Sequence, residues 1–194
     1  MPKEKTRCTW CVGSDIERTY HDEEWGEPVY DDLKHFEFIV LDSNQAGLSW
    51  ITMLKKREGY RKAFANFDPI KVAKFSEKKI EKLLLNPEII RNRLKVNATV
   101  GNARYFLEVQ KEFGTFDKYI WQFTGGKTLV NRWKKKEDVP VYTPEAEAMS
   151  KDLKKRGFKF VGPTICYAYM QAAGMVNDHV ISCYRYKEVG VRKK

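Results

Sequence analysis

Apolar residues recur at helical spacing along most of this 194-residue chain, and that pattern limits the possible folds more than any other feature. No stretch shows the sustained alternation of β-branched and polar residues that is typical of a half-buried strand. With 42% hydrophobic residues, the chain is long enough to bury one sizeable core. We therefore predict an all-α protein in which residues 1–194 form a single domain with two helical lobes.

Capping and breaking residues predict where the helices begin and end. Asp31-Asp32 can cap a first long helix, and the next is predicted from about Gln45 to Phe67, where Asp68-Pro69 interrupts it. Further helices are predicted from Ser76 to about Leu85, from Asn86-Pro87 to Gly114, from Phe116 to Phe123 and from Thr143-Pro144 onward. The stretch Thr124 to Tyr142 has no clear period, so we predict a surface loop, whose run Lys134-Lys135-Lys136 could contact phosphate.

The charge distribution favours a polyanionic partner. The formal net charge is +10, yet residues 1–50 hold 11 acidic and 5 basic residues, whereas residues 151–194 hold 3 acidic and 10 basic ones. The acidic residues 1–50 could face a pocket, while the basic remainder of the chain faces a phosphate backbone. The alternative is a basic surface that binds no nucleic acid. Neither a membrane-spanning apolar stretch nor a secretory signal is visible, so we expect a cytoplasmic protein without membrane contact.

Two glycines five residues apart lie between apolar helical stretches, in LKKRGFKFVGPT from Leu153 to Thr164. In a helix-hairpin-helix, such glycines let the backbone approach a phosphate, which the first N–H groups of the second helix then bind. The basic residues Lys154, Lys155, Arg156 and Lys159 would add attraction that salt weakens. The alternative is a solvated basic turn in which Gly157 ends the first helix.

The cysteines and histidines favour a metal site over disulfide bonds. Without an export signal, Cys8, Cys11, Cys166 and Cys183 are not expected to form a disulfide framework. On a helix capped by Asn177-Asp178, His179 and Cys183 would share one face. The other two ligands of a tetrahedral zinc ion could come from Cys8, Cys11 and His21, which would clamp the two chain ends together. The alternative is that these side chains are buried without a metal.

Aromatic residues and a carboxylate lie close together in the first quarter of the chain. Asp42 is predicted at the end of one helix, and Gly47-Leu48 precede Trp50 at the start of the next. The flat side chains of Trp10, Tyr20, Trp25 and Trp50 could form a stacking pocket for a ring. The alternative is an aromatic core with Asp42 on the surface.

Four segments of the chain resemble one known family. RCTWCVGSDIERTYHDEEWG, LDSNQAGLSWITMLKKREGYRKAF, EIIRNRLKVNATVGNARYF and LKKRGFKFVGPTICYAYMQAAGMVNDHVISC resemble, in this order, the bacterial Tag family of 3-methyladenine DNA glycosylase I. The resemblance covers roughly Arg7 to Cys183. It implies a helix-hairpin-helix enzyme that flips alkylated adenine out of double-stranded DNA and hydrolyses the N-glycosidic bond in base excision repair. It also implies a monomer with no obligate protein partner.

The resemblance assigns roles to residues of this sequence. It implies a structural Zn²⁺ bound by Cys8, His21, His179 and Cys183, without Cys11. It implies that Trp10, Tyr20, Asp42 and Trp50 bind the base, with Asp42 and Tyr20 as the catalytic pair. DNA contacts fall on Gly47, Leu48, Lys159 and Gly162, with Leu48 as the wedge that fills the gap in the duplex. Asp42 departs from the family's usual Glu, which shortens the side chain by about 1.5 Å.

Two positions define the expected chemistry further. The resemblance places Thr164 where bifunctional relatives have a nucleophilic lysine, so we expect hydrolysis without a lyase step. Asn177 stands where many relatives have an Asp, and Asp178 is not expected to be the catalytic base.

Two other functions compete with this interpretation. One is a non-enzymatic binder of damaged DNA, which Asp42 leaves open, and the other is a small-molecule hydrolase, which the lack of a nucleophile elbow or phosphate loop disfavours.

Overall fold

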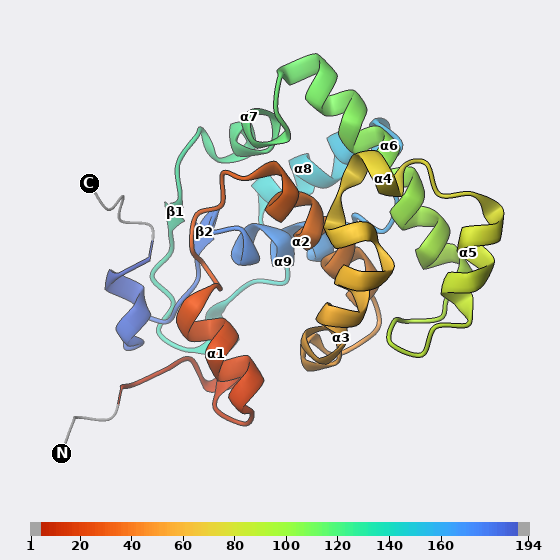
Figure 1. Ribbon diagram of the computed structural model, residues 1–194. Helices are drawn as coiled ribbons and strands as arrows, with labels where there is room; N and C mark the ends of the chain where they lie inside the picture. The colour runs from red at the N-terminus through yellow and green to blue at the C-terminus, as the bar shows by residue number, and fades with distance from the viewer. Residues whose placement is uncertain (1–4, 190–194) are drawn as a thin grey trace.

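The structure is a computed structural model that describes residues 5–189, and helices dominate it (Figure 1). The α-helices among these residues are α1 (Asp15–Glu23), α2 (Asp32–Gln45), α3 (Trp50–Ala63), α4 (Pro69–Val72), α5 (Glu77–Leu84), α6 (Arg93–Phe113), α7 (Phe116–Ile120), α8 (Pro144–Lys155) and α9 (Pro163–Ala172). Short 3-10 helices are η1 (Thr9–Cys11), η2 (Ala65–Phe67), η3 (Trp121–Thr124), η4 (Lys136–Asp138) and η5 (Tyr184–Lys187). The prediction of a mostly helical protein is confirmed.

One small strand pair departs from the all-α prediction. β1 (Leu129–Val130) and β2 (Val176–Asn177) pair in parallel, with Leu129 opposite Val176. β1 and η4 both lie in the stretch from 124 to 142 that was expected to be an irregular loop. Two residues are too few to produce an alternating pattern, so this pairing of distant segments left no periodic signal in the sequence.

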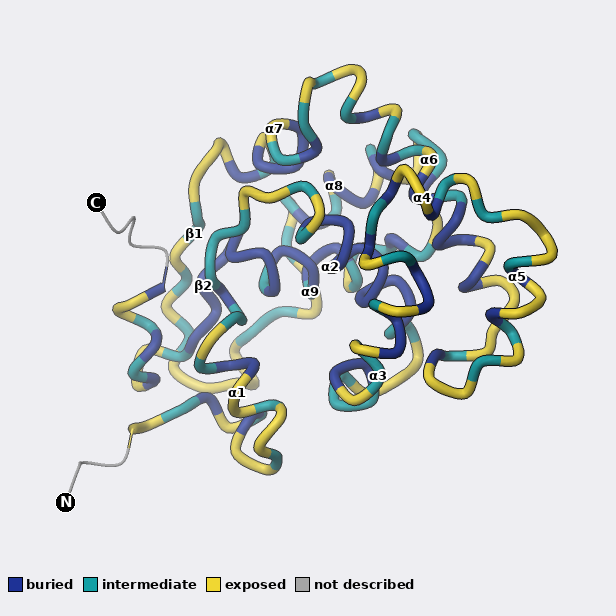
Figure 2. The backbone as a smooth tube through the Cα atoms, viewed as in Figure 1, coloured by how far each residue is buried: buried dark blue, intermediate teal, exposed yellow. Residues whose placement is uncertain are grey.

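The central helices α2 and α9 hold the core together. Every residue of α2 from His35 to Asn44 is buried, and this helix contacts α3, α6, α7 and α9 (Figure 2). Phe36 of α2 meets Phe106 edge to face, with ring centroids 5.2 Å apart, and Phe106 stacks on Phe116 at 4.1 Å. Because α2 is enclosed in this way, the backbone of its last turn has a fixed position.

Most of the helix ends that were predicted from capping residues are confirmed. Asp31 caps α2, where its carboxylate accepts a hydrogen bond from the Lys34 N–H at 2.8 Å, and Ser76 and Thr143 cap α5 and α8. Gly114, with φ of +86°, ends α6.

Two predicted helix starts are wrong. α3 begins at Trp50 instead of Gln45, because α2 itself runs to Gln45 and Gly47 breaks the chain with φ of +77°. α6 begins at Arg93 instead of Pro87, because the Ile90 N–H bonds the Tyr60 hydroxyl at 3.2 Å and Asn92 caps the helix.

The N-terminal and C-terminal segments lie side by side. The Tyr184 N–H donates to the Thr6 carbonyl at 2.9 Å, and the red N-terminal and blue C-terminal segments lie on the same side of the molecule (Figure 1). No helix within residues 5–189 has both the length and the apolar composition needed to cross a bilayer.

Candidate active site and metal centre

A cavity of about 680 Å³ lies between α1, α9, the start of α3 and the segment 134–141. Its walls include the four residues predicted to bind a base, which are Trp10, Tyr20, Asp42 and Trp50. A cavity of this volume falls in the range that small-molecule ligands occupy. The structure therefore brings these four residues together as expected.

Aromatic rings form much of the cavity wall. The ring centroids of Tyr20 and Trp50 are 5.4 Å apart with the planes tilted by 51°, and those of Trp10 and Tyr20 are 6.4 Å apart. Tyr20 is 3% exposed, whereas Trp10 and Trp50 are partly exposed, so π-faces remain accessible from the cavity. Trp25 meets Trp10 edge to face at 5.0 Å and also lines the cavity.

Asp42 is a buried carboxylate with an unpaired oxygen. It lies in the last turn of α2 and is 2% exposed, so the alternative of a surface Asp is wrong. Among residues 5–189, neither its Oδ2 atom nor the Trp50 Nε1 atom has a hydrogen-bond partner, although both are buried. Burial raises the pKa of Asp42 well above its usual range. A buried acceptor and a buried donor in one cavity wall are suited to a polar ligand, because leaving either unpaired costs about 1–3 kcal/mol.

The environment behind Asp42 offers no compensating charge. A second, small cavity of about 20 Å³ also contacts Asp42, and its other walls include Ile39, Met149 and Leu153. The polar groups of that wall, the Tyr169 hydroxyl and the Cys166 thiol, bond His35 and the Val161 carbonyl instead of Asp42. Burial also raises the pKa of Tyr20, and the charge of Asp42 raises it further, so this phenol stays protonated.

An ionic cluster fixes α1 against α2 and α3. The Arg57 guanidinium donates to both carboxylate oxygens of Glu24 at 2.7 Å and to Glu37 at 2.8 Å. Lys34 and Arg61 also pair with Glu37, which is 4% exposed. The cluster joins the three elements that carry Tyr20, Asp42 and Trp50. Sequence reasoning missed it, because most of its pairs join different helices and only Lys34 and Glu37 have the i, i+3 spacing that a helix pattern can reveal.

A rigid turn presents Leu48 at the surface. Leu48 is 37% exposed, its N–H donates to the Gln45 carbonyl at 2.7 Å, and its own carbonyl accepts from Gln45 Nε2 at 2.9 Å. Lys95 donates to the carbonyls of Asn44 and Ala46, both at 2.7 Å, which satisfies the C-terminal end of α2. This role of Lys95 was also missed, because a lysine inside a helix pattern is normally interpreted as solvated.

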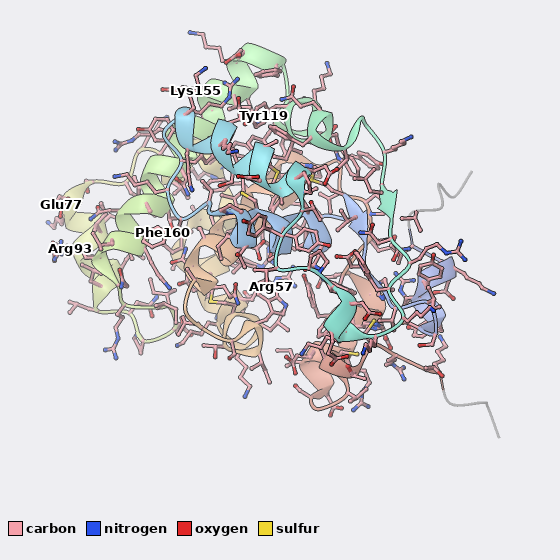
Figure 3. The ribbon with its side chains drawn as sticks, turned by 180° about the vertical axis from the view of Figure 1, so that it is seen from behind. Arg57, Glu77, Arg93, Tyr119, Lys155 and Phe160 are labelled. Carbon is pink, nitrogen blue, oxygen red and sulfur yellow. The ribbon has the colours of Figure 1, made fainter. Side chains whose placement is uncertain are left out.

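The predicted hairpin joins α8 to α9, with Lys155 and Phe160 labelled in Figure 3. Asn102 of α6 holds its turn by donating to the Lys159 carbonyl at 3.0 Å and accepting from the Lys159 N–H at 2.8 Å. Gly157 has φ of +101°, as a glycine that ends a helix requires. Gly162 has an ordinary φ of −65° and precedes α9, with nothing within 4 Å of the position of a Cβ. Gly162 therefore leaves open space at the start of α9.

The basic residues of the hairpin are not all available. Lys154, Lys155 and Lys159 are exposed. Arg156 instead pairs with Glu112 at 2.7 Å and with Asp152 at 2.7 Å, so its charge is engaged within the protein.

Two cysteines and two histidines come together beside the cavity. Ligand atoms of Cys8, His21, His179 and Cys183 all lie within 4.8 Å of one another, and all four residues are buried. The Cys183 sulfur is 3.4 Å from His21 Nε2 and 3.6 Å from His179 Nδ1, and the Cys8 sulfur is 3.7 Å from His179 Nδ1. Sulfur and nitrogen ligands around one tetrahedral zinc ion are about 3.6 Å apart, so the donor atoms have the right spacing.

Hydrogen bonds to the outer ring nitrogens orient both histidines. His21 Nδ1 bonds Asp22 at 2.8 Å, and Arg7 holds that carboxylate in turn. His179 Nε2 bonds the Trp25 carbonyl at 3.1 Å. Each ring thus directs its other nitrogen into the cluster, which is the arrangement of metal-binding histidines. Hydrogen bonding from Cys8 and then from the histidines lowers the pKa of Cys183.

Residues near the cluster correct parts of the sequence interpretation. The Cys11 sulfur donates to the Cys8 carbonyl at 3.1 Å and lies outside the ligand group, as the resemblance implied. His179 and Cys183 lie in a turn instead of on the expected helix, because the Asn177 side chain binds the His179 N–H and the carbonyls of Tyr186 and Val189.

Asp178 has a structural environment. Its carboxylate accepts hydrogen bonds from Asn131, Trp133, Tyr167 and Gln171 at 2.6–2.8 Å. Four donors occupy most of the acceptor capacity of this carboxylate.

Known proteins match almost the whole chain. A sequence model described as methyladenine glycosylase matches residues 10–186. The chain is 48% identical to DNA-3-methyladenine glycosylase 1 of Escherichia coli over 180 residues, which are 93% of this chain and 96% of that protein. A crystal structure of 3-methyladenine DNA glycosylase I matches with a TM-score of 0.90 and 47% identity, over 92% of this chain and 98% of the other. A tyrosine-to-phenylalanine variant of a 3-methyladenine DNA glycosylase I, in complex with 3-methyladenine, matches with a TM-score of 0.89 and 35% identity, over 92% and 96%.

Proposed function

This chain belongs to the methyladenine glycosylase family, and from that premise we propose that it removes 3-methyladenine from alkylated double-stranded DNA. The reaction is hydrolysis of the N-glycosidic bond after the damaged nucleotide has flipped into the cavity, as the first step of base excision repair. The observation that supports it most directly is the unpaired, buried carboxylate of Asp42 in an aromatic-walled cavity. We further propose one domain with two helical lobes, acting as a monomer in the cytoplasm.

Charge selects the damaged base. In DNA, 3-methyladenine carries a positive charge, whereas normal adenine is neutral. A cationic ring close to Asp42 lowers the pKa of this carboxyl again, so the ionised form pairs with the lesion. Tyr20, Trp10 and Trp50 add cation–π attraction from their ring faces. Neutral adenine gains neither contribution and leaves a buried carboxyl without a partner.

The same groups act in bond cleavage. Positive charge on the base already weakens the glycosidic bond, so the enzyme contributes mainly orientation and electrostatic stabilisation of the oxocarbenium-like sugar. Asp42 supplies the negative charge and Tyr20 a fixed hydroxyl in the cavity. Thr164, also in the cavity wall, cannot form a Schiff base, so the product is an intact abasic site. Because Asp42 is about 1.5 Å shorter than Glu, one of its contacts with the base runs through water.

Two separate elements contact the DNA. Gly47 gives the turn that projects Leu48, which fills the gap in the duplex. Lys159 and the open backbone at Gly162 bind phosphate together with the first N–H groups of α9.

The cysteine and histidine cluster binds Zn²⁺. Cys8, His21, His179 and Cys183 are its ligands, and their donor set and spacing fit a closed structural site. When bound, the ion joins the two ends of the chain next to Trp10 and Trp25, whose rings contact His21 and His179 and also line the cavity.

Chromatography of bases released from methylated duplex DNA tests this function. We expect the wild type to release 3-methyladenine, and we expect Asp42→Glu to release it at least as fast, because the longer arm reaches the base directly. Wild-type protein that binds the DNA but releases no methylated base would show that the chain is a binder of damaged DNA and not a glycosylase.

A further inference from the structure

Three consecutive lysines lie in the wall of the active-site cavity. Lys134, Lys135 and Lys136, which we call the lysine segment, line it together with Trp10 of η1 and Tyr20 of α1. The sequence predicts only that this run could contact phosphate, and the site described above does not use it. Figure 3 shows the teal chain that follows β1 passing close to the red helix α1.

The ammonium groups of the lysine segment have no partner in the part of the chain that the structure describes. Within residues 5–189, none of the three lies within 4.0 Å of a carboxylate, whereas Arg57, Arg61 and Arg156 are all paired. The acids nearby do not cancel them by contact. Glu17 and Glu137 also line the cavity without pairing with these lysines, and the Asp138 carboxylate accepts the backbone N–H groups of Lys134 and Lys135 at 3.2 Å.

The backbone of the segment has a defined position. Just before it, Trp133 donates to Asp178 at 2.8 Å, and its carbonyl accepts from the Ile181 N–H at 2.9 Å. At the end of the segment, Lys136 begins η4, and the Asp138 carboxylate bonds the backbone N–H groups of Lys134 and Lys135. The backbone that carries three exposed cations is therefore fixed at the cavity, which reduces the ordering cost of binding an anion.

The cavity has a second phosphate-binding element on another side. Thr164, in the first turn of α9, lines the same cavity. A nucleotide that enters the cavity base first is still joined to the strand by phosphates on both sides of its sugar. The start of α9 can bind one side of this strand, and the lysine segment is the unpaired cationic element that remains for the other.

We propose that the lysine segment binds the backbone phosphates of the lesion strand next to the flipped nucleotide. This inference rests on the proposed function and extends it, because it adds a contact that holds the nucleotide in its flipped state. It predicts a contribution to DNA binding that is independent of base identity and weakened by salt.

A charge-matched pair of variants tests the proposal. Lys134→Gln/Lys135→Gln/Lys136→Gln removes the three positive charges of the lysine segment. The control, Lys111→Gln/Lys118→Gln/Lys127→Gln, removes three other exposed positive charges, on α6, on α7 and between η3 and β1. In Figure 1, α7 lies at the opposite end of the molecule from α1. Duplex affinity is measured by fluorescence anisotropy at several salt concentrations. We expect the first variant to flatten the slope of log affinity against log salt by about 0.9 for each lost phosphate contact. We expect the control to leave the slope unchanged, and equal slopes in the two variants would overturn the proposal.

Neutral backbone linkages locate the contact. Replacing the phosphates beside the lesion by methylphosphonates removes their charge without changing the base. We expect the wild type to bind this DNA at least tenfold more weakly than it binds unmodified DNA. The affinity of the triple variant should fall by a much smaller factor, because that variant has already lost the contact. An equal loss in both proteins would place the lysine segment away from the lesion strand. Binding of free 3-methyladenine by both proteins shows that the pocket is intact. If wild-type protein releases no base from methylated DNA, the proposed function fails, while these binding results still decide whether the lysine segment contacts phosphate.

Discussion

At the scale of single residues, Asp42 couples stability to function. Its folded-state pKa lies above the unfolded value of about 4, so the folded protein holds a proton that the unfolded chain releases. The free energy of unfolding is therefore greatest below the unfolded-state pKa of about 4, and it falls as the pH rises from there toward the folded-state pKa. We predict that Asp42→Asn, which removes the titration, unfolds at a higher temperature than the wild type at pH 8, by a few degrees. The gain should shrink at pH 5, and a gain independent of pH would contradict the burial of this charge.

Tyr20 and Trp50 form the wall on which the base stacks. We predict that Trp50→Ala weakens binding of free 3-methyladenine by about tenfold, because a base–aromatic stack contributes about 1–3 kcal/mol. Tyr20→Phe keeps the ring and should retain base binding while slowing excision. Isothermal titration with the free base and single-turnover excision separate the two effects. Metal content should stay unchanged in both variants, and loss of zinc would contradict the separation of pocket and metal cluster.

At the scale of elements, the two hairpin glycines serve different purposes. A Cβ at Gly157 would lie 2.4 Å from the Tyr105 ring with φ at +101°, whereas Gly162 has open space and an ordinary φ. We predict that Gly157→Ala lowers the free energy of unfolding by about 2 kcal/mol or more. Gly162→Ala should change stability by less than about 1 kcal/mol yet weaken DNA binding, because its methyl group obstructs the phosphate at the start of α9. Urea unfolding and anisotropy measure both, and equal stability losses would refute the difference.

The sequence predicted elements where local chemistry decides them. Asp31, Ser76 and Thr143 cap helices through their own side chains, so their signals are local. The late start of α6 depends on the Tyr60 hydroxyl, a contact across the fold that no local pattern contains. The turn at His179 and Cys183 was mistaken for a helix because the Asn177 side chain bonds the carbonyls of Tyr186 and Val189, which lie beyond the reach of helical spacing.

At the scale of the whole molecule, metal binding links the two chain ends. Cys8 and His21 precede the core helices, and His179 and Cys183 follow them, so a bound ion closes almost the entire chain. We predict that Cys183→Ala loses zinc and at least about 3 kcal/mol of stability, because the remaining buried donors are uncompensated. Cys11→Ala, at a buried cysteine outside the ligand group, should keep the metal. Atomic absorption and thermal unfolding check both variants, and normal zinc content in Cys183→Ala would contradict the ligand assignment.

How far the site itself could be predicted depends on the range of each interaction. Trp10, Tyr20, Asp42 and Trp50 were identified from residue type and the family resemblance, and the fold places all four around one cavity. The residues that hold them in place, such as Arg57 and Lys95, were missed because their partners lie on other helices. The unpaired state of the Asp42 oxygen could not be predicted either, because it depends on what every surrounding element leaves uncovered.

The central claim is that a buried anionic side chain selects a cationic base. Single-turnover release of 3-methyladenine from methylated duplex DNA at pH 7.5, compared between the wild type and Asp42→Asn, tests it most directly. The account predicts that the variant, folded and still able to bind free 3-methyladenine, releases the base about 10²-fold more slowly. Release at the wild-type rate by a carboxamide at this position would contradict the claim.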